Sequence, residues 1–437
     1  MSREAVRLVI TAIGDPDGYK KVKYVIGESE FENAFSSLSL AEAIGAERLV
    51  VVAGLSLFKK INAVFQTAEF SALASAVEEY VRDWIAKNTK FDSAKIDVIV
   101  APNVYGKTLY AKGRRDPYFA YTYYELLRRL EEYKWRKLEL YVDTTHGINY
   151  MPLLLTEALR LTASVYTIVH SGRGKAETQI YVYNAEPFEP GVERLHFMLL
   201  WREIITPAVA VTRITEFFQR DDNKSYVEKL TNKLNASGGN VDDLRGKCGD
   251  VLDDIFKAGR ALYGGLYLYL YTKVECYNRY VKRLEDVLKS VKLEKDESGG
   301  GGYMYVEYPE PTAARLHALL YSIVQWLEPL EGHKTPDAAA PALSTKEIKR
   351  LSDLAPSEII KTIIRHELDQ IEKSSVPTEP TLWAEVKNKD KGHECKVNRR
   401  NIYAHGGLNE YAIFVYKRGE EIYLTYGKCL KEIERHL

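Results

Sequence analysis

This chain of 437 residues is short of several features that mark specialised protein classes. Its four cysteines show no paired spacing, so the sequence predicts neither a disulfide framework nor a zinc site. Its 61 Lys and Arg balance 61 Asp and Glu, which argues against a protein that simply coats nucleic acid. No apolar run approaches the roughly 20 residues of a membrane-spanning helix, and the N-terminus does not resemble a signal peptide. We therefore expect a cytoplasmic protein that binds no metal and no membrane.

The remaining composition is that of a globular protein with more than one domain. Hydrophobic residues make up 46% of the chain and charged residues 28%, enough for two or three cores. In residues 1–187, amphipathic stretches separate continuous apolar runs. Because such runs are typical of strands buried on both faces, they predict a parallel, Rossmann-like sheet. The predicted strands are 6–13, 47–54, 96–101, 138–143, 163–170 and 178–183, and the predicted helices include 68–87 and 118–134.

The rest of the chain is predicted to be mostly helical. Residues 188–240 form a helical linker of helix-turn-helix type, and residues 241–437 form a C-terminal helical domain. Two alternating segments in this domain predict inserted hairpins, one at 298–308 after a glycine run and one at 411–426. The fold class is therefore α/β plus α. The predicted helices are 196–220, 224–234, 241–293, 312–327, 345–354 and 356–373.

Near the C-terminus, one short segment combines a cation, an amide and an imidazole. On an α-helix, Asn401 and His405 stand four residues apart and share a face, and Arg400 lies beside them. A Gly-Gly pair follows His405 and would end the helix there, at the negative end of its dipole, where a protonated ring is favoured. Arg399 is a second candidate for the cation. The alternative is that these side chains form an ordinary solvated surface.

This combination of groups suits metal-free cleavage of RNA. RNA carries its own nucleophile, the 2′-hydroxyl, so a ribonuclease needs a group that moves protons near neutral pH and a cation that stabilises the phosphorane. Imidazole meets the first need and guanidinium the second. Residues 387–400 contain six Lys or Arg against two acids, a local cationic patch in an otherwise neutral chain. Such a patch suits a polyanion, although a run of charge can also be a solvated face.

A second polar cluster follows the predicted strand 138–143. Asp143, Thr144, Thr145, His146 and Gly147 lead directly into the next helix, with Asn149 two residues further along. Ligands collect at the carboxyl edge of a parallel sheet, where helix N-termini attract anions. Neither G-x-G-x-x-G nor a Walker pattern is present, so a nicotinamide or ATP site is less expected. The alternative is that Asp143 and Thr144 cap the helix, and Asp143 could also orient the loop or meet a sugar hydroxyl.

The order of these features resembles the CARF-HEPN ribonucleases of type III CRISPR systems, in the Csx/Csm accessory nuclease group. The resemblance rests on a Rossmann-like domain with D-T-T-H-G after a late strand, a helical linker, and a helical domain that ends in R-N-x-x-x-H. It implies that Arg400, Asn401 and His405 are catalytic, which favours Arg400 over Arg399. It also implies a nucleotide site lined by Gly14, Asp15, Ser37, Asp143, Thr144, Thr145, His146, Gly147 and Asn149, with Ser36 and Ser39 as weaker candidates.

The resemblance also implies a function in antiviral defence. A cyclic oligoadenylate, by family analogy cyclic tetra-adenylate, would bind the first domain as an allosteric activator. The C-terminal domain of a homodimer, or of a higher oligomer, would then cleave single-stranded RNA through 2′-hydroxyl attack without a metal or another cofactor. Two alternatives remain open at this point. The protein could be a messenger-responsive transcriptional regulator that binds DNA, or a ring nuclease that degrades the cyclic messenger.

Overall fold

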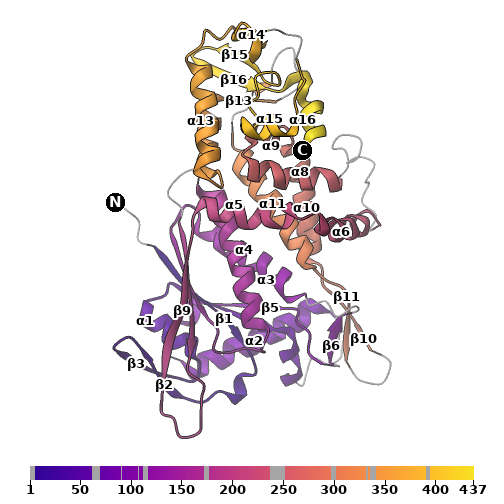
Figure 1. Ribbon diagram of the computed structural model, residues 1–437. Coiled ribbons are helices and arrows are strands. Elements are labelled where there is room, and N and C mark those ends of the chain that lie inside the picture. Colours follow the sequence, from indigo (N-terminus) through magenta and orange to yellow (C-terminus); the bar gives the residue numbers. More distant parts are fainter. Residues whose placement is uncertain are drawn as a thin grey trace. The chain divides into compact units, whose positions relative to one another are not determined.

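The structure is a computed structural model (Figure 1), and its elements fall into two compact units that we describe separately. The first unit comprises Met1–Tyr166, Lys175–Ile205 and Leu284–Ala314, and the second comprises Thr167–Gly174, Thr206–Arg283 and Arg315–Leu437. The residues that the structure describes are 5–61, 69–89, 91–106, 108–111, 117–171, 177–236, 251–296, 302–330, 333–334, 341–389 and 394–437.

An eight-stranded sheet forms the centre of the first unit, in the order β3-β2-β9-β8-β7-β1-β4-β5. The pairs from β8 to β5 are all parallel, as the continuous apolar runs predicted. On the other side, β9 runs antiparallel to β8, and the β2–β3 hairpin, which the sequence patterns missed, extends the sheet. The strands are β1 Val6–Ile13, β2 Val22–Ile26, β3 Ser29–Asn33, β4 Arg48–Gly54, β5 Ile96–Ala101, β7 Leu138–Asp143, β8 Thr178–Ala185 and β9 Arg194–Ile205.

Four helices accompany this sheet, namely α1 Ser36–Ile44, α2 Phe70–Asn88, α3 Tyr118–Leu130 and α4 Met151–Ser171. Apolar residues of α1 and α2 share one core with alternate residues of β1 and β4, such as Val9 and Val51. On β1, Thr11 pairs with Asp143 of β7, so the carboxyl ends of these two strands lie side by side. The strand order reverses at this point, which is where an open α/β sheet usually binds a ligand.

Two predictions in this unit are wrong. Residues 163–170 are the second half of α4 and not a strand, because the apolar run is long enough to continue the helix that starts at Met151. Residues 194–205 form the long strand β9 and not a helix, because they pair along β8. Within the described residues, α4 is the one helix long and apolar enough to cross a membrane, and 67% of that apolar stretch is buried, as expected for a core helix.

The predicted hairpin near residue 303 is confirmed, but it belongs to the first unit. Strands β10 (Lys292–Lys295) and β11 (Tyr303–Glu307) pair antiparallel, and residues 298–301 of the glycine run lie outside the described residues. Strand β11 also pairs in parallel with β6 (Leu109–Ala111), which lies almost 200 residues earlier in the chain. Short-range patterns could not predict that pairing.

The second unit is mainly helical, as predicted, and its five-stranded sheet has the order β12-β13-β16-β15-β14. Its predicted hairpin is the antiparallel pair β15–β16. The predicted boundaries at 187 and 240 remain predictions, as does the helix-turn-helix character of the linker; residues 237–250 lie outside the described part. The helices are α5 Pro207–Glu216, α6 Lys224–Ala236, α8 Val251–Gly264, α9 Tyr267–Thr272, α10 Val274–Lys289, α11 Pro311–Leu327, α12 Thr345–Leu351, α13 Glu358–Glu372, α14 Trp383–Val386, α15 Arg399–Ala404 and α16 Leu430–His436, and the strands are β12 His333–Lys334, β13 Pro341–Ser344, β14 Thr381–Leu382, β15 Phe414–Arg418 and β16 Glu421–Thr425.

Candidate functional site

The R-N-x-x-x-H segment forms the short helix α15 and the turn that follows it. The side chain of Asn398 caps the helix by accepting a hydrogen bond from the backbone N–H of Asn401, at 2.9 Å. The helix ends at Ala404, so His405 directly follows the helix and does not lie within it. His405 is the C-cap, with φ −116° and ψ 15°. The two glycines after it end the helix, as predicted.

Close packing against α13 explains why glycines follow His405. Gly406 has a positive φ of 54°, and a Cβ atom at this position would meet the side chain of Ile364 at 2.5 Å. A Cβ atom on Gly407 would meet the hydroxyl oxygen of Tyr426 at 2.7 Å. Neither position therefore has room for a side chain. The turn lies directly on α13, one helical turn from Glu367.

Glu367 is the partner of His405. The Nδ1 atom of His405 lies 2.8 Å from Oε1 of Glu367, and Glu367 itself is 9% exposed. This hydrogen bond raises the pKa of His405 above its ordinary value of 6.5, and the charge of Glu410 acts in the same direction. The imidazole side chain remains 39% exposed. His405 is therefore held by one nitrogen and accessible to solvent.

Sequence reasoning missed Glu367, although the sequence contains a signal for it. The predicted helix 356–373 has an apolar face that includes Ile364 and Leu368, both of which are buried. Glu367 stands three residues after Ile364 and shares this face. A carboxylate at a core position is uncommon unless it is paired, so Glu367 required a partner.

The other motif side chains are exposed. Arg400 and Asn401 both lie on the solvent side of α15, and within the described residues neither side chain has an ion pair or hydrogen bond. Arg399 instead places its guanidinium over the ring of Tyr403, 6.0 Å from the centroid. Arg400 is thus available to an external anion, whereas Arg399 already has an intramolecular partner.

The predicted cationic patch is partly neutralised by Glu410, which lies outside the segment 387–400. Lys387 and Lys389 both bind this carboxylate, at 3.2 and 2.6 Å. Residues 390–393 lie outside the described part of the chain. Lys387 and Lys389 are therefore less available to a polyanion than the sequence suggests, and Arg400 on α15 is more available.

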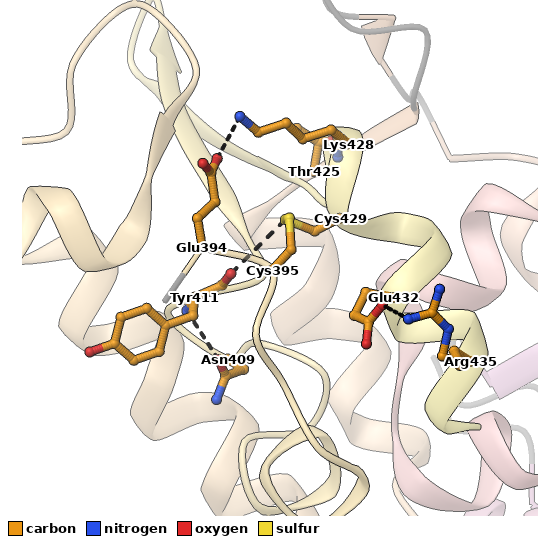
Figure 2. Close-up of a disulfide and its surroundings, with 10 residues drawn as sticks. Glu394, Cys395, Asn409, Tyr411, Thr425, Lys428, Cys429, Glu432 and Arg435 are labelled. Carbon is orange, nitrogen blue, oxygen red and sulfur yellow. Dashed lines mark hydrogen bonds and ion pairs between the residues drawn. A yellow bond between two sulfur atoms is a disulfide. The ribbon is translucent and has the colours of Figure 1, made fainter. Parts of the chain in front are cut away.

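A disulfide between Cys395 and Cys429 lies just before α15 (Figure 2). Their Cα atoms are 5.0 Å apart, and 34 residues separate them in the sequence. The backbone N–H of Cys395 also donates to the carbonyl of Tyr411, at 2.8 Å. Cys276 is disulfide-bonded too. The prediction that the cysteines form no disulfide framework is therefore wrong, because tertiary contact and not regular spacing brings these thiols together.

The second polar cluster is organised by Asp143 at the end of β7. Its carboxylate is fully buried and accepts hydrogen bonds from the hydroxyls of Ser36 and Ser37, at 2.5 and 2.6 Å, and from the N–H of Thr145, at 2.9 Å. Of the open alternatives for Asp143, the structure supports orientation of the loop. The hydroxyl of Ser37 is likewise engaged within the protein.

The two threonines fasten this loop to β8. The hydroxyl of Thr144 donates to the carbonyl of Tyr183 at 2.9 Å and accepts from the amide of Asn184. The hydroxyl of Thr145 accepts from the N–H of Ala185, at 2.8 Å. Both hydroxyls therefore help to fix the loop between β7 and α4.

The loops after β1 and β7 touch through glycines. A Cβ atom on Gly14 would lie 3.5 Å from Gly147, and Gly147 has φ +114°. The ring of His146 stacks on Tyr19, with centroids 4.2 Å apart, and its Nε2 is 3.4 Å from the N–H of Ser36. Burial lowers the pKa of His146 below its ordinary value, and the charge of Asp143 acts in the opposite direction.

Two further predicted residues lie toward solvent. Asp15 is exposed, caps a short turn and forms an ion pair with Lys60, at 2.8 Å. Asn149 is exposed in the loop before α4. The structure thus places all nine predicted nucleotide-site residues in the first unit near the carboxyl edge of the sheet, and whether they bind a nucleotide remains a prediction. In the described residues, His, Cys, Asp and Glu form no cluster of three or more that could hold a metal.

A surface groove opens beside Thr144, between α4 and β9. It encloses about 570 Å³, and its lining includes Leu153 and Leu200. Within it, the guanidinium of Arg160 lies over the ring of Trp201 and binds Glu203, at 3.0 Å. The groove is therefore largely apolar, with its central cation already paired.

Comparisons with known proteins match both units. Residues 8–187 match the family model described as CRISPR system endoribonuclease Csx1, CARF domain. Residues 357–429 match the model described as CRISPR system endoribonuclease Csx1, HEPN domain. The chain is also similar to a CRISPR system endoribonuclease Csx1 from Methanocaldococcus jannaschii, at 26% identity over 189 residues. This match covers 42% of the chain and 37% of the relative, so it spans little more than a third of that protein.

Proposed function

Because this chain belongs to the CARF-HEPN ribonucleases of CRISPR systems, we propose that it cleaves single-stranded RNA when a cyclic oligoadenylate binds its first unit. The observation that carries the proposal is the arrangement at α15. An imidazole is anchored through Nδ1 by a buried carboxylate, and the exposed guanidinium of Arg400 is free of acidic partners in the described part of the protein. These are the groups that RNA cleavage without a metal requires.

The reaction uses the 2′-hydroxyl of the RNA. Its oxygen attacks the adjacent phosphorus while the bond to the 5′-oxygen breaks, which leaves a 2′,3′-cyclic phosphate and a 5′-hydroxyl. His405 in its protonated form donates the Nε2 proton to the departing 5′-oxygen, and the imidazole of a second copy accepts the proton of the 2′-hydroxyl. Arg400 stabilises the charge on the phosphorane, and Asn401 hydrogen-bonds the substrate.

The activator site lies at the carboxyl edge of the large sheet. Gly14 and Gly147 let the loops after β1 and β7 pack closely there, and Asn149 offers an exposed amide. Buried hydrogen bonds to Asp143 hold this loop in one conformation, which lowers the entropic cost of binding. We propose cyclic tetra-adenylate as the activator and the cytoplasm as the place of action.

A cyclic activator fits a twofold axis, so we propose a homodimer. Exposed apolar side chains of the first unit gather on β9 and at the start of α4, beside the groove next to Thr144. Leu153 is 65% and Leu200 52% exposed, and Met198, Leu199 and Ile204 are also exposed. Several exposed apolar side chains on neighbouring elements are consistent with an interface.

Substitution of this surface tests the dimer. Leu153→Glu adds a charge to an exposed apolar site, so we expect the mass measured by light scattering to fall to that of a monomer. Ile359→Glu is the control, because Ile359 is 73% exposed at the start of α13. A dimer that persists in the Leu153 variant would exclude this surface as the interface.

The activity itself is tested by RNA cleavage in EDTA with each cyclic oligoadenylate in turn. We expect cleavage with one ring size, products that end in 2′,3′-cyclic phosphate, and complete loss of cleavage in His405→Ala. Full activity in that variant would end the assignment of the catalytic site. Loss of all activity in EDTA, restored by a divalent ion, would contradict the metal-free reaction.

The alternative of a DNA-binding regulator receives no support from the described part of the linker. Residues 194–205 form strand β9, and the described helices α5 and α6 follow it. The alternative of messenger cleavage also lacks a specific observation, since the nearest imidazole, His146, is stacked on Tyr19 and only partly exposed. Chromatography of the cyclic oligoadenylate after incubation would detect such an activity.

A further inference from the structure

Glu367 sits behind His405 on the side away from solvent, and nothing in the R-N-x-x-x-H motif includes it. Its carboxylate lies 2.8 Å from Nδ1 of His405 and is 9% exposed. An ionised carboxylate only accepts hydrogen bonds, so Nδ1 is the donor and carries a proton in this pair. The remaining nitrogen, Nε2, is then the one that exchanges protons with substrate. We propose that Glu367 is a positioning residue of the nuclease site, a role that rests on the proposed function.

Packing makes this role specific to Glu367. Ile364, one turn earlier on α13, is the residue against which Gly406 lies, so the same helical face fixes both the turn and the imidazole. The other charged groups near His405 are Glu410 and Lys387, which oppose each other in their effect on its pKa. Lys389 binds Glu410 as well. Among these groups, Glu367 makes the direct hydrogen bond to the ring.

The pH dependence of cleavage tests the role. A carboxylate beside the ring keeps His405 protonated to higher pH, so its removal should cost activity most on the alkaline side. We expect Glu367→Gln, which keeps a hydrogen-bond acceptor but removes the charge, to shift the alkaline limb of the rate profile to lower pH, with KM for RNA unchanged. Glu367→Ala should reduce kcat by roughly tenfold or more, since proton transfer by a misoriented base or acid is inefficient.

Controls separate this proposal from the proposed function. Glu372→Gln removes a carboxylate from the same helix, where it binds Lys349, and should leave the profile unchanged. If His405→Ala is inactive while both Glu367 variants keep the wild-type rate and pH profile, the positioning role is wrong and the catalytic site stands. If His405→Ala is fully active, the site assignment itself fails. Melting curves show which variants are folded. If Glu367→Ala is unfolded, the pKa of His405 is measured by NMR in folded Glu367→Gln. An unshifted pKa of His405 would overturn the proposal.

A separate set of contacts links the loop after β7 to the β10–β11 hairpin. The hydroxyl of Tyr150, in that loop, donates to the carbonyl of Val104 at 2.9 Å and accepts from its N–H at 3.1 Å. The preceding carbonyl, that of Asn103, accepts a hydrogen bond from the hydroxyl of Tyr305 on β11, at 3.1 Å. Two adjacent peptide groups just after β5 therefore hydrogen-bond both to the loop after β7 and to the hairpin.

The Tyr305 end of these contacts is buried, and the Tyr150 end is partly buried. Asn103 is fully buried, and its side chain binds both the N–H and the hydroxyl of Ser56. Tyr303 and Tyr305 are 2% and 1% exposed and belong to the core that includes β1 and β4. A hydroxyl in such surroundings is costly to leave without a partner, so a shift of one end of the chain of contacts favours a shift of the other.

The hairpin is also continuous with the nuclease half of the chain. Helix α10 leads into β10, and β11 leads through three residues into α11, whose later residues belong to the second unit. We infer that the contacts of Tyr150 and Tyr305 relay messenger binding from the loop after β7 to the β10–β11 hairpin. A shift of the hairpin would change the position of α11 and hence the nuclease activity. This inference also rests on the proposed function.

Removal of single hydroxyls tests the relay with little change in packing. We expect Tyr305→Phe and Tyr150→Phe to keep the messenger-free rate and the affinity for cyclic tetra-adenylate, but to lower the activation by the messenger at least several-fold. Because both act on one path, the double variant should lose no more than the stronger single variant. Fluorescent-RNA cleavage and calorimetric messenger binding measure these quantities.

Tyr110→Phe is the matched control. The hydroxyl of Tyr110, on β6, hydrogen-bonds Asp296 beside the same hairpin but does not touch the loop after β7. Equal loss of activation in Tyr110→Phe, or strictly additive losses in the double variant, would overturn the relay. Should Tyr305→Phe fail to fold, Tyr150→Phe and its control decide alone. A wild-type protein that no messenger activates would instead refute the proposed function.

Discussion

The two motif regions differ in how far the protein itself satisfies their polar side chains. At the end of β7, Asp143 binds two serine hydroxyls and a backbone N–H, and both threonine hydroxyls are bonded to β8. On α15, Arg400 and Asn401 face solvent, and the described part of the chain provides neither with a polar partner. In one region the polar side chains are satisfied within the chain, and in the other they are open to solvent.

This difference indicates distinct tasks. A loop whose polar groups are already bonded has a fixed shape, which suits recognition of a ligand by backbone groups and by the few side chains that remain free. A site with an unpaired guanidinium and an anchored imidazole suits charge that develops on a substrate brought from outside. The comparison therefore predicts large effects on catalysis from α15 and large effects on stability from Asp143.

The largest expected effect is on catalysis at Arg400. We predict that Arg400→Ala lowers kcat for RNA cleavage by roughly 10²- to 10³-fold, the usual cost of losing one charge-stabilising donor. Arg399→Ala should cost far less, because the guanidinium of Arg399 already lies over the ring of Tyr403. Single-turnover cleavage assays measure both. Equal losses in the two variants would remove the distinction between the two arginines.

The next effect concerns the stability of the segment before α15. We predict that Cys395→Ser lowers the free energy of unfolding by about 3–4 kcal/mol, because the disulfide closes a loop with a sequence separation of 34 residues. Urea denaturation of the wild type and the variant measures the difference. The double variant with Cys429→Ser should lose no more than the single one. A larger loss in the double variant would mean that the cysteines act independently of their bond.

Prediction from sequence succeeded where a local pattern decides the structure. Strands β1, β5 and β7 have the predicted bounds, because each is a continuous apolar run flanked by polar residues. It failed for residues 163–170 and 194–205, where apolar residues suit either a helix or a strand and the neighbouring element makes the choice. The pairing of β11 with β6 depends on contacts across the chain, which no local pattern contains.

The candidate sites show the same division. The motifs located α15 and the loop after β7, because catalytic and binding residues cluster in short polar segments. They could not show that Asp143 binds Ser37, because these residues lie 106 positions apart in the sequence. Nor could they show that Glu367 binds His405, because these residues lie 38 positions apart. Sequence patterns identified which side chains are polar, and tertiary contacts decided which of them are already satisfied.

A moderate effect is expected at Asp143. We predict that Asp143→Ala lowers the free energy of unfolding by about 2–3 kcal/mol, because it leaves buried hydroxyls and an N–H without their acceptor. Asp15→Ala is the control, since Asp15 is exposed and its ion pair with Lys60 is expected to contribute less than about 1 kcal/mol. Thermal and urea unfolding compare the two. Similar losses would show that the buried network does not stabilise the loop.

The smallest expected effect distinguishes His146, which stabilises the loop, from Asn149, which is free to contact the ligand. His146 stacks on Tyr19 and lies near the N–H of Ser36, so His146→Ala should lower both the melting temperature and the affinity for the messenger. Asn149 is exposed, so Asn149→Ala should leave the melting temperature unchanged and weaken binding of cyclic tetra-adenylate by about five- to tenfold, the value of one hydrogen bond. Calorimetric titration measures the messenger affinity of both variants, and thermal melting measures their stability. Unchanged affinity in Asn149→Ala would show that the exposed amide of Asn149 does not contact the messenger, and the predicted side-chain contact at this edge of the sheet would be wrong.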